Sequence, residues 1–580
     1  MHDPQTEVIN QARELILSAA GAAVAAGKLP SEPIPAFTIE IPSDSAHGDL
    51  ASNFAMVSAR AFHKAPRMIA QAVLEQLDTT GTAFSKVEIA GPGFINFFYD
   101  STYYKKTVSE VLEDKEKFGR SDYGTGKKLM VEFVSANPTG PMHLGNARGG
   151  AIGDVLASIF DYAGFDVTRE FYINDTGNQI AKFGKSLAAR YHQLTDPEYP
   201  FPEEGYQGED IKVHARNFAD IYGTDLKLSE EELQKKITDY ALPINIANLK
   251  TDLEKYKINY DVWFRESSLY QGDKTVEKIM GILKENDAIY EKDGAVWLKT
   301  SKYLRELYKR QGKTDEEIEK LELKDDVLRR ANGFYTYFAS DIGYHYNKFV
   351  IRGFDKVINV WGADHHGHVA RLKAALEAVG IDSSRMDIVL MQLVELLRNG
   401  EAVRMSKRTG KAITLTTLLD EVPIDAARYF FNQREPNTHC EFDLDLAVKQ
   451  DKDNPVYYVQ YAYARICSIL RQLESDGYQI DGSKDYDSSL FATEEEKALI
   501  RKLGSLPADI VSCAKDYDPS RVTKFVYETA TLFHKFYTVC RVKDAGSEDL
   551  TAARTALCVA TKQVIKNCLD ILGITAPDVM

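Results

Sequence analysis

Residues 127–160 limit the possible folds more than any other stretch of the chain. They begin with an apolar run rich in β-branched and aromatic residues, 129–134, which predicts a buried strand. Residues 135–141 contain two prolines and a glycine, a composition typical of a turn. From His143 onward glycine and alanine recur, and apolar residues follow at helical spacing. The stretch therefore predicts a strand, a turn and a helix whose first turns are rich in glycine.

Such a unit aims backbone N–H groups and the positive end of a helix dipole at an anion, usually phosphate. The spacing matches neither the GxGxxG pattern nor the Walker pattern, so those two phosphate loops are excluded. A tight packing turn that binds nothing fits the pattern equally well. This stretch alone therefore leaves the choice open.

A second polar segment decides between the two interpretations. Residues 404–411 carry four cations around a serine and a glycine, in a segment too polar to be core. Two motifs resemble the HIGH and KMSKS signatures of class I aminoacyl-tRNA synthetases: His143-Leu144-Gly145-Asn146 and Arg404-Met405-Ser406-Lys407. Their order and wide separation along the chain also agree with that family.

The composition is that of an ordinary globular protein of several domains. Hydrophobic residues make up 44% and charged residues 27%, and 580 residues correspond to roughly three or four domains. No stretch resembles a signal peptide or is long enough to cross a bilayer, so we expect a cytoplasmic enzyme without a membrane partner. The net charge of −15 argues against a nucleic-acid binder when taken alone, but binding depends on where the cations lie.

The sequence offers little support for a bound metal. The six cysteines all lie in the last third without zinc-ligand spacing, so we predict buried thiols in helices and no structural zinc. Three histidines beside Asp364 raise the alternative of a metal site: His365, His366 and His368. Neighbours in sequence point in different directions and no distant fourth ligand is evident, so we predict no metal there.

The order of predicted elements indicates a multidomain α/β protein. A strand at 167–173 completes a βαβ unit with the central helix, which favours a parallel, doubly wound sheet. Charged helices dominate residues 191–325, which we interpret as a helical insertion between two halves of a Rossmann-like domain. The second half is expected to contain strands at 335–341, 357–360 and 388–396 and a helix at 369–379. After residue 440 the pattern predicts only helices, at 455–474, 493–515, 519–543 and 549–572.

Five motifs narrow the resemblance to arginyl-tRNA synthetases of the bacterial type. They are HGDLASNFAM at 47–56, GPGFINF at 91–97, DTGNQI at 175–180, DAARYFF at 425–431 and PVYYVQYAYARI at 455–466. The resemblance implies an N-terminal α/β module at 1–110 that contacts the outer corner of tRNA. It also implies two halves of the catalytic domain at 111–190 and 326–439, the insertion at 191–325, and an all-α anticodon-binding bundle of the DALR type at 440–580.

The reaction implied by this resemblance is the activation of L-arginine with ATP, followed by transfer of arginine to the terminal ribose of tRNA(Arg). The expected partners are tRNA(Arg), ATP with Mg²⁺, and L-arginine, and we expect a monomer. The family generally activates arginine only in the presence of tRNA, so we expect the same of this chain.

The resemblance assigns roles to individual positions. His143 can donate to phosphate oxygens, and Lys407 and Arg404 supply positive charge. Asn146 stands where the family usually has a second histidine; its amide can donate a hydrogen bond but cannot carry charge. The matching ATP positions are Pro141, Gly145, Gly362, Asp364, His368, Met405 and Ser406.

An arginine site requires carboxylates for the guanidinium. The positions that match the family's amino-acid site are Glu132, Asn137, Tyr337 and Asp341. Glu132 interrupts a buried strand, where an unpaired carboxylate would be costly, so a cation-binding pocket would explain it. We therefore expect Glu132 and Asp341 to face the same pocket.

Cations beside aromatic residues at 521–543 suit the unstacked bases of an RNA loop. Most of these aromatics are expected in the core, with one or two at the RNA surface. The predicted tRNA contacts are Asn96, Arg465, Phe536, Arg541 and Met580. For Asn96 the alternative is a strand asparagine that serves only its own sheet.

Two other functions stay open. One is another class I synthetase, with the cysteinyl enzyme nearest, although the zinc cysteines are missing. The other is a non-catalytic tRNA-binding paralogue. His143 and Lys407 argue against that alternative, and Asn146 is the one departure that favours it.

Overall fold

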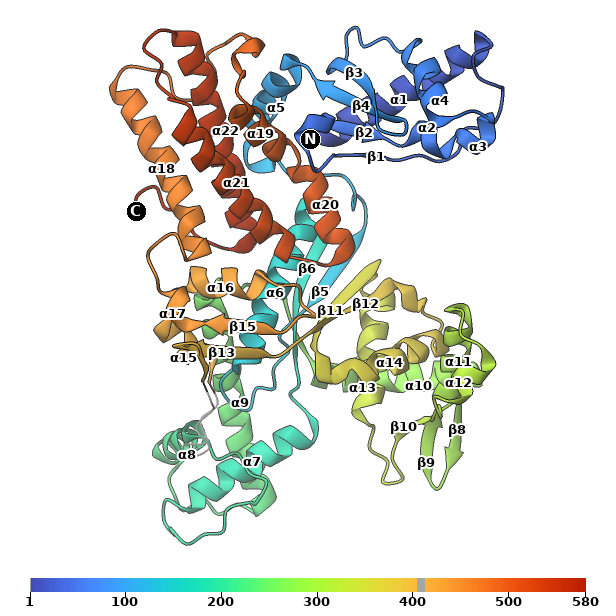
Figure 1. Ribbon diagram of the computed structural model, residues 1–580. Helices are drawn as coiled ribbons and strands as arrows, with labels where there is room; N and C mark the ends of the chain where they lie inside the picture. The colour runs from blue at the N-terminus through green and yellow to red at the C-terminus, as the bar shows by residue number, and fades with distance from the viewer. Residues whose placement is uncertain (1, 404–412) are drawn as a thin grey trace.

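The computed structural model describes residues 2–403 and 413–580. It confirms a multidomain α/β architecture (Figure 1). A parallel-sheet domain lies between an N-terminal module, a C-terminal helical bundle and two units that extend from its lower side in this view. None of the helices in these two ranges is long and apolar enough to cross a membrane.

The N-terminal module packs helices on a small antiparallel sheet of order β1-β2-β4-β3. Asp3 caps the first helix by accepting a hydrogen bond from the Thr6 N–H. The two strands expected around the Gly-Pro-Gly turn pair with each other, and Gly93 in that turn has a φ of +137°. The elements are α1 (Pro4–Ala25), β1 (Ile39–Glu40), β2 (Leu50–Ser52), α2 (Phe54–Val57), α3 (Ala59–Phe62), α4 (Pro66–Leu74), β3 (Phe84–Ala90), β4 (Phe94–Tyr99) and the connecting helix α5 (Ser101–Asp114).

Five parallel strands form the centre of the molecule, in the order β12-β11-β5-β6-β7. They are β5 (Lys128–Glu132), β6 (Asp166–Ile173), β7 (Val262–Arg265), β11 (Lys356–Gly362) and β12 (Met386–Met391). The small residues of helix α6 (Leu144–Tyr162) bring it against this sheet, since a Cβ added at Gly153 would lie 2.2 Å from the Phe133 side chain. The strand order reverses between β5 and β11, so the carboxyl ends of these two strands border the crevice where such sheets bind ligands.

The segment 191–325, predicted to be a helical insertion, also contains strands. Strand β7 is the edge strand of the central sheet, and β8 (Ile289–Lys292) and β9 (Ala295–Leu298) form a separate antiparallel sheet with β10 (Asp326–Arg329), which directly follows the segment. Each of these strands has four residues, too few to show an alternating pattern among charged neighbours. The helices are α7 (Gly177–His192), α8 (Glu209–Tyr222) and α9 (Glu230–Lys255) in one unit, and α10 (Thr275–Glu285), α11 (Thr300–Arg310) and α12 (Asp315–Glu319) in the other.

The structure corrects two strand predictions in the second half. Residues 335–341, predicted as a strand, enter helix α13 (Tyr337–Tyr346), whose N-cap Thr336 accepts a hydrogen bond from the Ala339 N–H. The two tyrosines at 335 and 337 suggested alternation, but the cap and the buried residues that follow have helical spacing. Helix α14 (His366–Ala378) lies where a helix was predicted.

The predicted strand 388–396 is two strands in different sheets. Strand β12 ends at Met391, and the Gln392 N–H then bonds to the Pro436 carbonyl. Strand β13 (Val394–Arg398) joins β14 (Glu401–Ala402) and β15 (Cys440–Asp443) in a sheet of order β14-β13-β15. The apolar pattern continues across this break, so the break cannot be recognised from hydrophobic periodicity.

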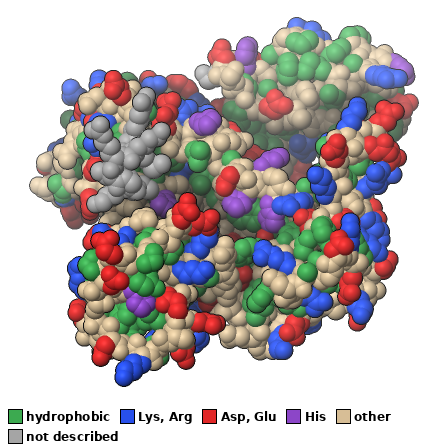
Figure 2. All heavy atoms as spheres, turned by 90° about the horizontal axis from the view of Figure 1, so that it is seen from below, with side chains coloured by type: hydrophobic (Ala, Val, Ile, Leu, Met, Phe, Trp, Pro, Cys, Tyr) green, Lys and Arg blue, Asp and Glu red, His purple; other side chains and the backbone are tan. Residues whose placement is uncertain are grey.

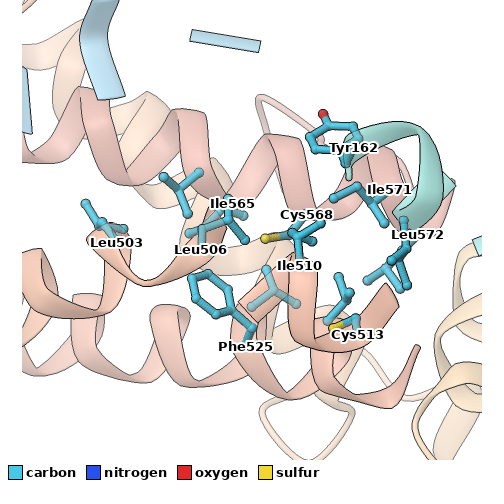
Figure 3. Packing of buried hydrophobic residues seen from close by; sticks show 14 of the residues in the cluster. Tyr162, Leu503, Leu506, Ile510, Cys513, Phe525, Ile565, Cys568, Ile571 and Leu572 are labelled. Atoms are coloured by element: carbon cyan, nitrogen blue, oxygen red, sulfur yellow. The ribbon is translucent and has the colours of Figure 1, made fainter. Parts of the chain in front are cut away.

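The C-terminal part is helical, as predicted. Its helices are α15 (Leu415–Glu421), α16 (Ile424–Asn432), α17 (Leu444–Ala447), α18 (Pro455–Ser475), α19 (Glu494–Gly504), α20 (Leu506–Asp516), α21 (Ser520–Val539) and α22 (Glu548–Leu572). The single helix predicted at 493–515 breaks at Ser505, where Pro507 begins a new helix in its first turn. Apolar residues of α19 to α22 interdigitate, and Tyr162 at the end of α6 contacts the same cluster (Figure 3).

A buried ion pair fixes this bundle on the catalytic domain. Arg428 of α16, fully buried, donates to Asp154 of α6 at 2.5 Å and to the Leu572 carbonyl at 2.7 Å. Gly573 leaves room for this arginine, because a Cβ there would lie 2.4 Å from the guanidinium. Removing Asp154 would leave the Arg428 guanidinium buried without a carboxylate, whereas Asp154 also pairs with Arg169 at 3.1 Å. The bond from Arg428 to the Leu572 carbonyl links this ion pair to the end of α22 in the bundle.

All six cysteines are buried and free. Four lie in helices, whereas Cys540 directly follows α21 and Cys440 lies in β15, so the prediction of helical thiols is wrong for these two. Within residues 2–403 and 413–580, no group of three or more His, Cys, Asp or Glu side chains is placed to hold a metal ion.

Candidate active site

A large cavity of about 1860 Å³ opens at the carboxyl ends of β5 and β11. Histidine side chains gather in the middle of this face of the molecule (Figure 2). The predicted ATP and arginine residues that the structure describes all line this cavity: Glu132, Asn137, Pro141, His143, Gly145, Asn146, Tyr337, Asp341, Gly362, Asp364 and His368. The expectation that Glu132 and Asp341 border one pocket is therefore confirmed.

The start of helix α6 forms one wall of the cavity. His143 is the N-cap residue and its side chain is exposed, so it can reach a ligand in front of the helix. A Cβ added at Gly145 would meet nothing within 4 Å, which shows open space beside the backbone of the first turn. This arrangement suits an anion at a helix N-terminus.

The segment 413–415 pairs with the residues around His143. The Leu144 N–H bonds to the Ile413 carbonyl at 3.0 Å, and the Leu415 N–H to the Met142 carbonyl at 2.9 Å. Ile413 and Thr414 line the cavity together with His143. The chain directly after residue 412 therefore borders the helix start. The predicted residues Arg404, Met405, Ser406 and Lys407 lie outside the described residues.

Helix α13 supplies a second wall. Tyr337 and Asp341 are four residues apart and so lie on one face of the helix. The Asp341 carboxylate is 2.6 Å from Nε2 of His368 on α14, which orients the carboxylate toward the cavity. The Tyr337 hydroxyl accepts a hydrogen bond from the Asn178 N–H at 2.9 Å.

A smaller cavity of about 330 Å³ adjoins the first and is lined by polar side chains. The two cavities share four residues: Asn137, Tyr172, Tyr337 and Asp341. The smaller one adds a second carboxylate, Glu266, which is 2% exposed and follows strand β7. Burial raises the pKa of the Glu266 carboxyl, so this site favours a bound cation that would offset the burial of the charge.

The sequence analysis missed Glu266 because it lies in the segment interpreted as a helical insertion. The available signal was its place directly after a short aromatic strand, Val262–Arg265, since polar residues at the carboxyl ends of parallel strands border the ligand crevice. Asn174, Asn178 and Gln179 were also missed as individual residues, although Asn178 and Gln179 lie within the quoted DTGNQI motif and Asn174 directly precedes it.

Both carboxylate oxygens of Glu132 accept hydrogen bonds from other side chains of this protein. The Lys348 ammonium, fully buried, lies 2.5 Å from Oε2, and the Ser135 hydroxyl donates to Oε1 at 2.9 Å. The explanation of Glu132 by a cation-binding pocket is therefore wrong: a lysine of this chain neutralises it. A single lysine in a helical segment gave no sequence signal for this pair.

His345 lies in the wall of the larger cavity and is almost fully buried. Burial, helped by the positive charge of Lys348, lowers the pKa of His345 to about 4, from an ordinary 6.5. Between pH 6.5 and 4 the unfolded chain therefore binds a proton that the folded chain does not. We predict that the free energy of unfolding of the catalytic domain falls by about 3 kcal/mol across this window as the pH is lowered.

Urea unfolding at several pH values, followed by tryptophan fluorescence, measures this slope. The His345→Gln variant has no group to titrate there and should show a flatter pH profile. Identical pH slopes for the two proteins would contradict the assignment.

The predicted tRNA residues divide into buried and exposed ones. Phe536 is fully buried in the bundle and Asn96 is 1% exposed between two neighbouring strands, so neither presents its side chain to an RNA surface and both predictions are corrected. Arg541 and Met580 are exposed and Arg465 is half-buried. The aromatic residues of α21 were expected mostly in the core, and Phe536 is one of those that lie there.

Family models cover nearly the whole chain. They are described as the arginyl tRNA synthetase N terminal domain, matching residues 10–99, the catalytic domain of class I (R) tRNA synthetases, matching 107–450, and the DALR anticodon binding domain, matching 459–580. The domain boundaries given above stay predictions.

Curated relatives extend over the same length. An arginine–tRNA ligase from Caldanaerobacter subterraneus subsp. tengcongensis is 53% identical over 569 residues, 98% of each chain. Another from Ruminiclostridium cellulolyticum is 49% identical over 583 residues and covers all of both chains.

Solved structures have the same architecture. A Campylobacter jejuni structure described as an arginyl-tRNA synthetase superposes with a TM-score of 0.72 at 33% identity, over 83% of this chain and all of that one. Thermus thermophilus arginyl-tRNA synthetase superposes with a TM-score of 0.71 at 21% identity, over 97% of this chain and 99% of that one. At this identity the match supports the fold alone. Together with the cavity at the carboxyl ends of β5 and β11, these matches show that the chain belongs to the class I arginyl-tRNA synthetases.

Proposed function

We propose that this chain activates L-arginine with ATP and then transfers it to the 3′-terminal ribose of tRNA(Arg). The observation that carries this proposal is the pair of joined cavities. The larger one presents a helix N-terminus to an anion, and the smaller one presents two carboxylates to a cation. Arginyl-adenylate combines both charges in one molecule.

ATP, as its Mg²⁺ complex, would occupy the larger cavity beside Gly145, Gly362 and Asp364. The arginine carboxylate attacks the α-phosphorus, the bond to the β-phosphate bridging oxygen breaks, and pyrophosphate leaves. Negative charge grows on the phosphoryl oxygens in this step, so donors fixed in advance stabilise it most. His143 and the amide of Asn146 lie where they can donate.

The guanidinium would lie in the smaller cavity between Asp341 and Glu266, with Tyr337 beside it. Two carboxylates can accept its planar fork of N–H groups, and an ion of this kind is bound more strongly where water is excluded. We therefore place Glu266 in the arginine site. We assign the guanidinium to Asp341 and Glu266 in preference to Glu132, because Lys348 already neutralises the Glu132 carboxylate.

A cation among aromatic rings lies on the helical bundle between α18 and α21. The Arg465 guanidinium sits 4.9 Å from the Tyr461 ring and 5.1 Å from the Tyr537 ring. His534 stacks on Tyr461 in the same cluster. Such a surface suits unstacked bases, so we propose it as the part that binds the anticodon loop.

Replacing Arg465 by alanine should raise the KM for tRNA by about tenfold, because one stacking or ionic contact contributes roughly 1–3 kcal/mol to RNA binding. The KM for arginine should not change. Steady-state aminoacylation measures both constants, and Lys566→Ala serves as a control on the exposed face of α22. An unchanged KM for tRNA would remove this surface from the proposal.

ATP–pyrophosphate exchange tests the proposed function. We expect exchange with arginine when tRNA is present and none without tRNA. Exchange with another amino acid would contradict the arginine assignment, and robust exchange without tRNA would contradict the tRNA requirement. A monomeric state and a cytoplasmic location stay predictions.

A further inference from the structure

A continuous chain of polar groups runs along the wall of the larger cavity, with Glu132 and His345 in its lining. The Lys348 ammonium contacts Glu132 at 2.5 Å and the side-chain oxygen of Asn359 at 3.1 Å. The Asn359 amide nitrogen lies 3.0 Å from Nε2 of His345, whose Nδ1 lies 2.8 Å from the Asp341 carbonyl. Lys348 and Asn359 are fully buried, and Glu132 and His345 are nearly so.

The direction of each hydrogen bond in this chain follows from chemistry. An ammonium can only donate and a backbone carbonyl can only accept. Asn359 must therefore accept from Lys348 and donate to Nε2, so His345 carries its proton on Nδ1 and gives it to Asp341 O. Every member has one compatible role, and the Lys348 charge cancels that of Glu132.

One end of this chain holds a strained turn. Val134 and Ser135 have φ values of +70° and +44°, a conformation that a β-branched residue such as valine rarely adopts. The Ser135 hydroxyl donates to Glu132 and accepts from the Tyr172 N–H at 3.1 Å. This turn leads directly to Asn137 in the arginine site.

The other end holds helix α13. His345 bonds to the carbonyl of Asp341, the residue proposed to bind the guanidinium. Lys348 itself lies in the π-helical turn (Asn347–Ile351) that follows α13, and π-helical turns are frequent at functional sites. Its ammonium also lies 4.0 Å from the Tyr344 ring. Both walls of the arginine site are thus tied to one side chain.

We propose that Lys348 is a positioning residue that sets the spacing between the Asn137 turn and helix α13, and so the fit of the site to arginine. This inference rests on the proposed function. ATP should be less affected, because the start of α6 is held separately by its hydrogen bonds to Ile413 and Leu415.

The Lys348→Met variant tests the proposal. In pyrophosphate exchange with tRNA present, the KM for arginine should rise about tenfold or more, because small misplacements in an oriented site have large effects. The KM for ATP should stay within about twofold of wild type. The matched control is Arg554→Met, which breaks another buried pair, with Glu496 at 2.8 Å in the helical bundle, away from both ends of the chain. Its KM for arginine should match wild type.

The route through Glu132 is tested by a double variant. Lys348→Met with Glu132→Gln should be no worse for arginine than Lys348→Met alone, because residues that act as a unit are not additive. An increase in the KM for arginine in the double variant that equals the product of the two single-variant increases would overturn this route. Ser135→Ala keeps the ion pair but cuts the link to the turn, and should raise the KM for arginine by about threefold. If Lys348→Met fails to fold, an unchanged KM in Ser135→Ala overturns the proposal.

A spectroscopic measurement separates this proposal from the proposed function. The ¹⁵N shifts of labelled histidine, assigned with a His345→Gln sample and followed over pH, should show that His345 takes up its second proton at a higher pH in Lys348→Met than in the wild type, because the positive charge of Lys348 helps to lower the pKa of His345. This result does not depend on which amino acid is a substrate. Failure of the wild type to charge tRNA with arginine would contradict the proposed function but not the role of Lys348. The same pH dependence of the His345 shifts in both proteins, or equal increases in KM for arginine and ATP, would overturn the role of Lys348.

Discussion

Asp341→Asn should lower kcat/KM for arginine by roughly 10²- to 10³-fold, which corresponds to the loss of a buried charge partner. The variant keeps the shape of the side chain but removes the charge that faces the guanidinium. It also leaves Glu266 alone with the cation in a cavity of about 330 Å³. The KM for ATP should change less, because only the contact with His368 links Asp341 to the proposed nucleotide site.

Pyrophosphate exchange with tRNA present, at varied arginine and ATP, measures this split. Asp326→Asn is the matched control, since it removes a carboxylate that pairs with Arg371 and is absent from the linings of the two described cavities. An Asp341→Asn enzyme with wild-type kcat/KM for arginine would refute the placement of the guanidinium.

His143→Ala should lower kcat for adenylate formation by roughly 10²- to 10³-fold, the cost of losing one fixed donor to a developing negative charge. The KM for arginine should stay near its wild-type value, because His143 lies in the larger cavity and not in the smaller one. Single-turnover formation of arginyl-adenylate isolates the step.

A second histidine, His366, offers a control. It is an exposed histidine at the start of α14 and is absent from the lining of the larger cavity. His366→Ala should leave adenylate formation unchanged. An equal loss of adenylate formation in His366→Ala would contradict a specific role of His143 as a donor to phosphate.

The sequence predicted the elements whose pattern is local and strong. The strand–turn–helix unit at 127–160, the strand that follows it and the helices of the C-terminal bundle have long apolar periods, and the structure contains them, with the helix predicted at 493–515 divided in two at Ser505. Short strands among charged residues, such as β7 to β10, carry too little pattern to be recognised. Helix α13 was missed because tyrosines at its start imitate strand alternation.

The candidate site divides in the same way. Positions that match a family motif, such as Asn137, Tyr337 and Asp341, lie together around the predicted cavity. Partners supplied by tertiary packing had no motif: Glu266 comes from an edge strand, and Lys348 reaches Glu132 across 216 residues of sequence. Phe536 was misplaced for the opposite reason, since an aromatic residue beside cations has the same sequence pattern in a core as at an RNA surface.

The most direct test of the account is to charge purified tRNA with each of the amino acids in turn, using the wild-type enzyme and ATP. Attachment of arginine alone is the result predicted by two joined cavities, one for a phosphate chain and one for a guanidinium. Attachment of a different amino acid, or of none, would contradict it.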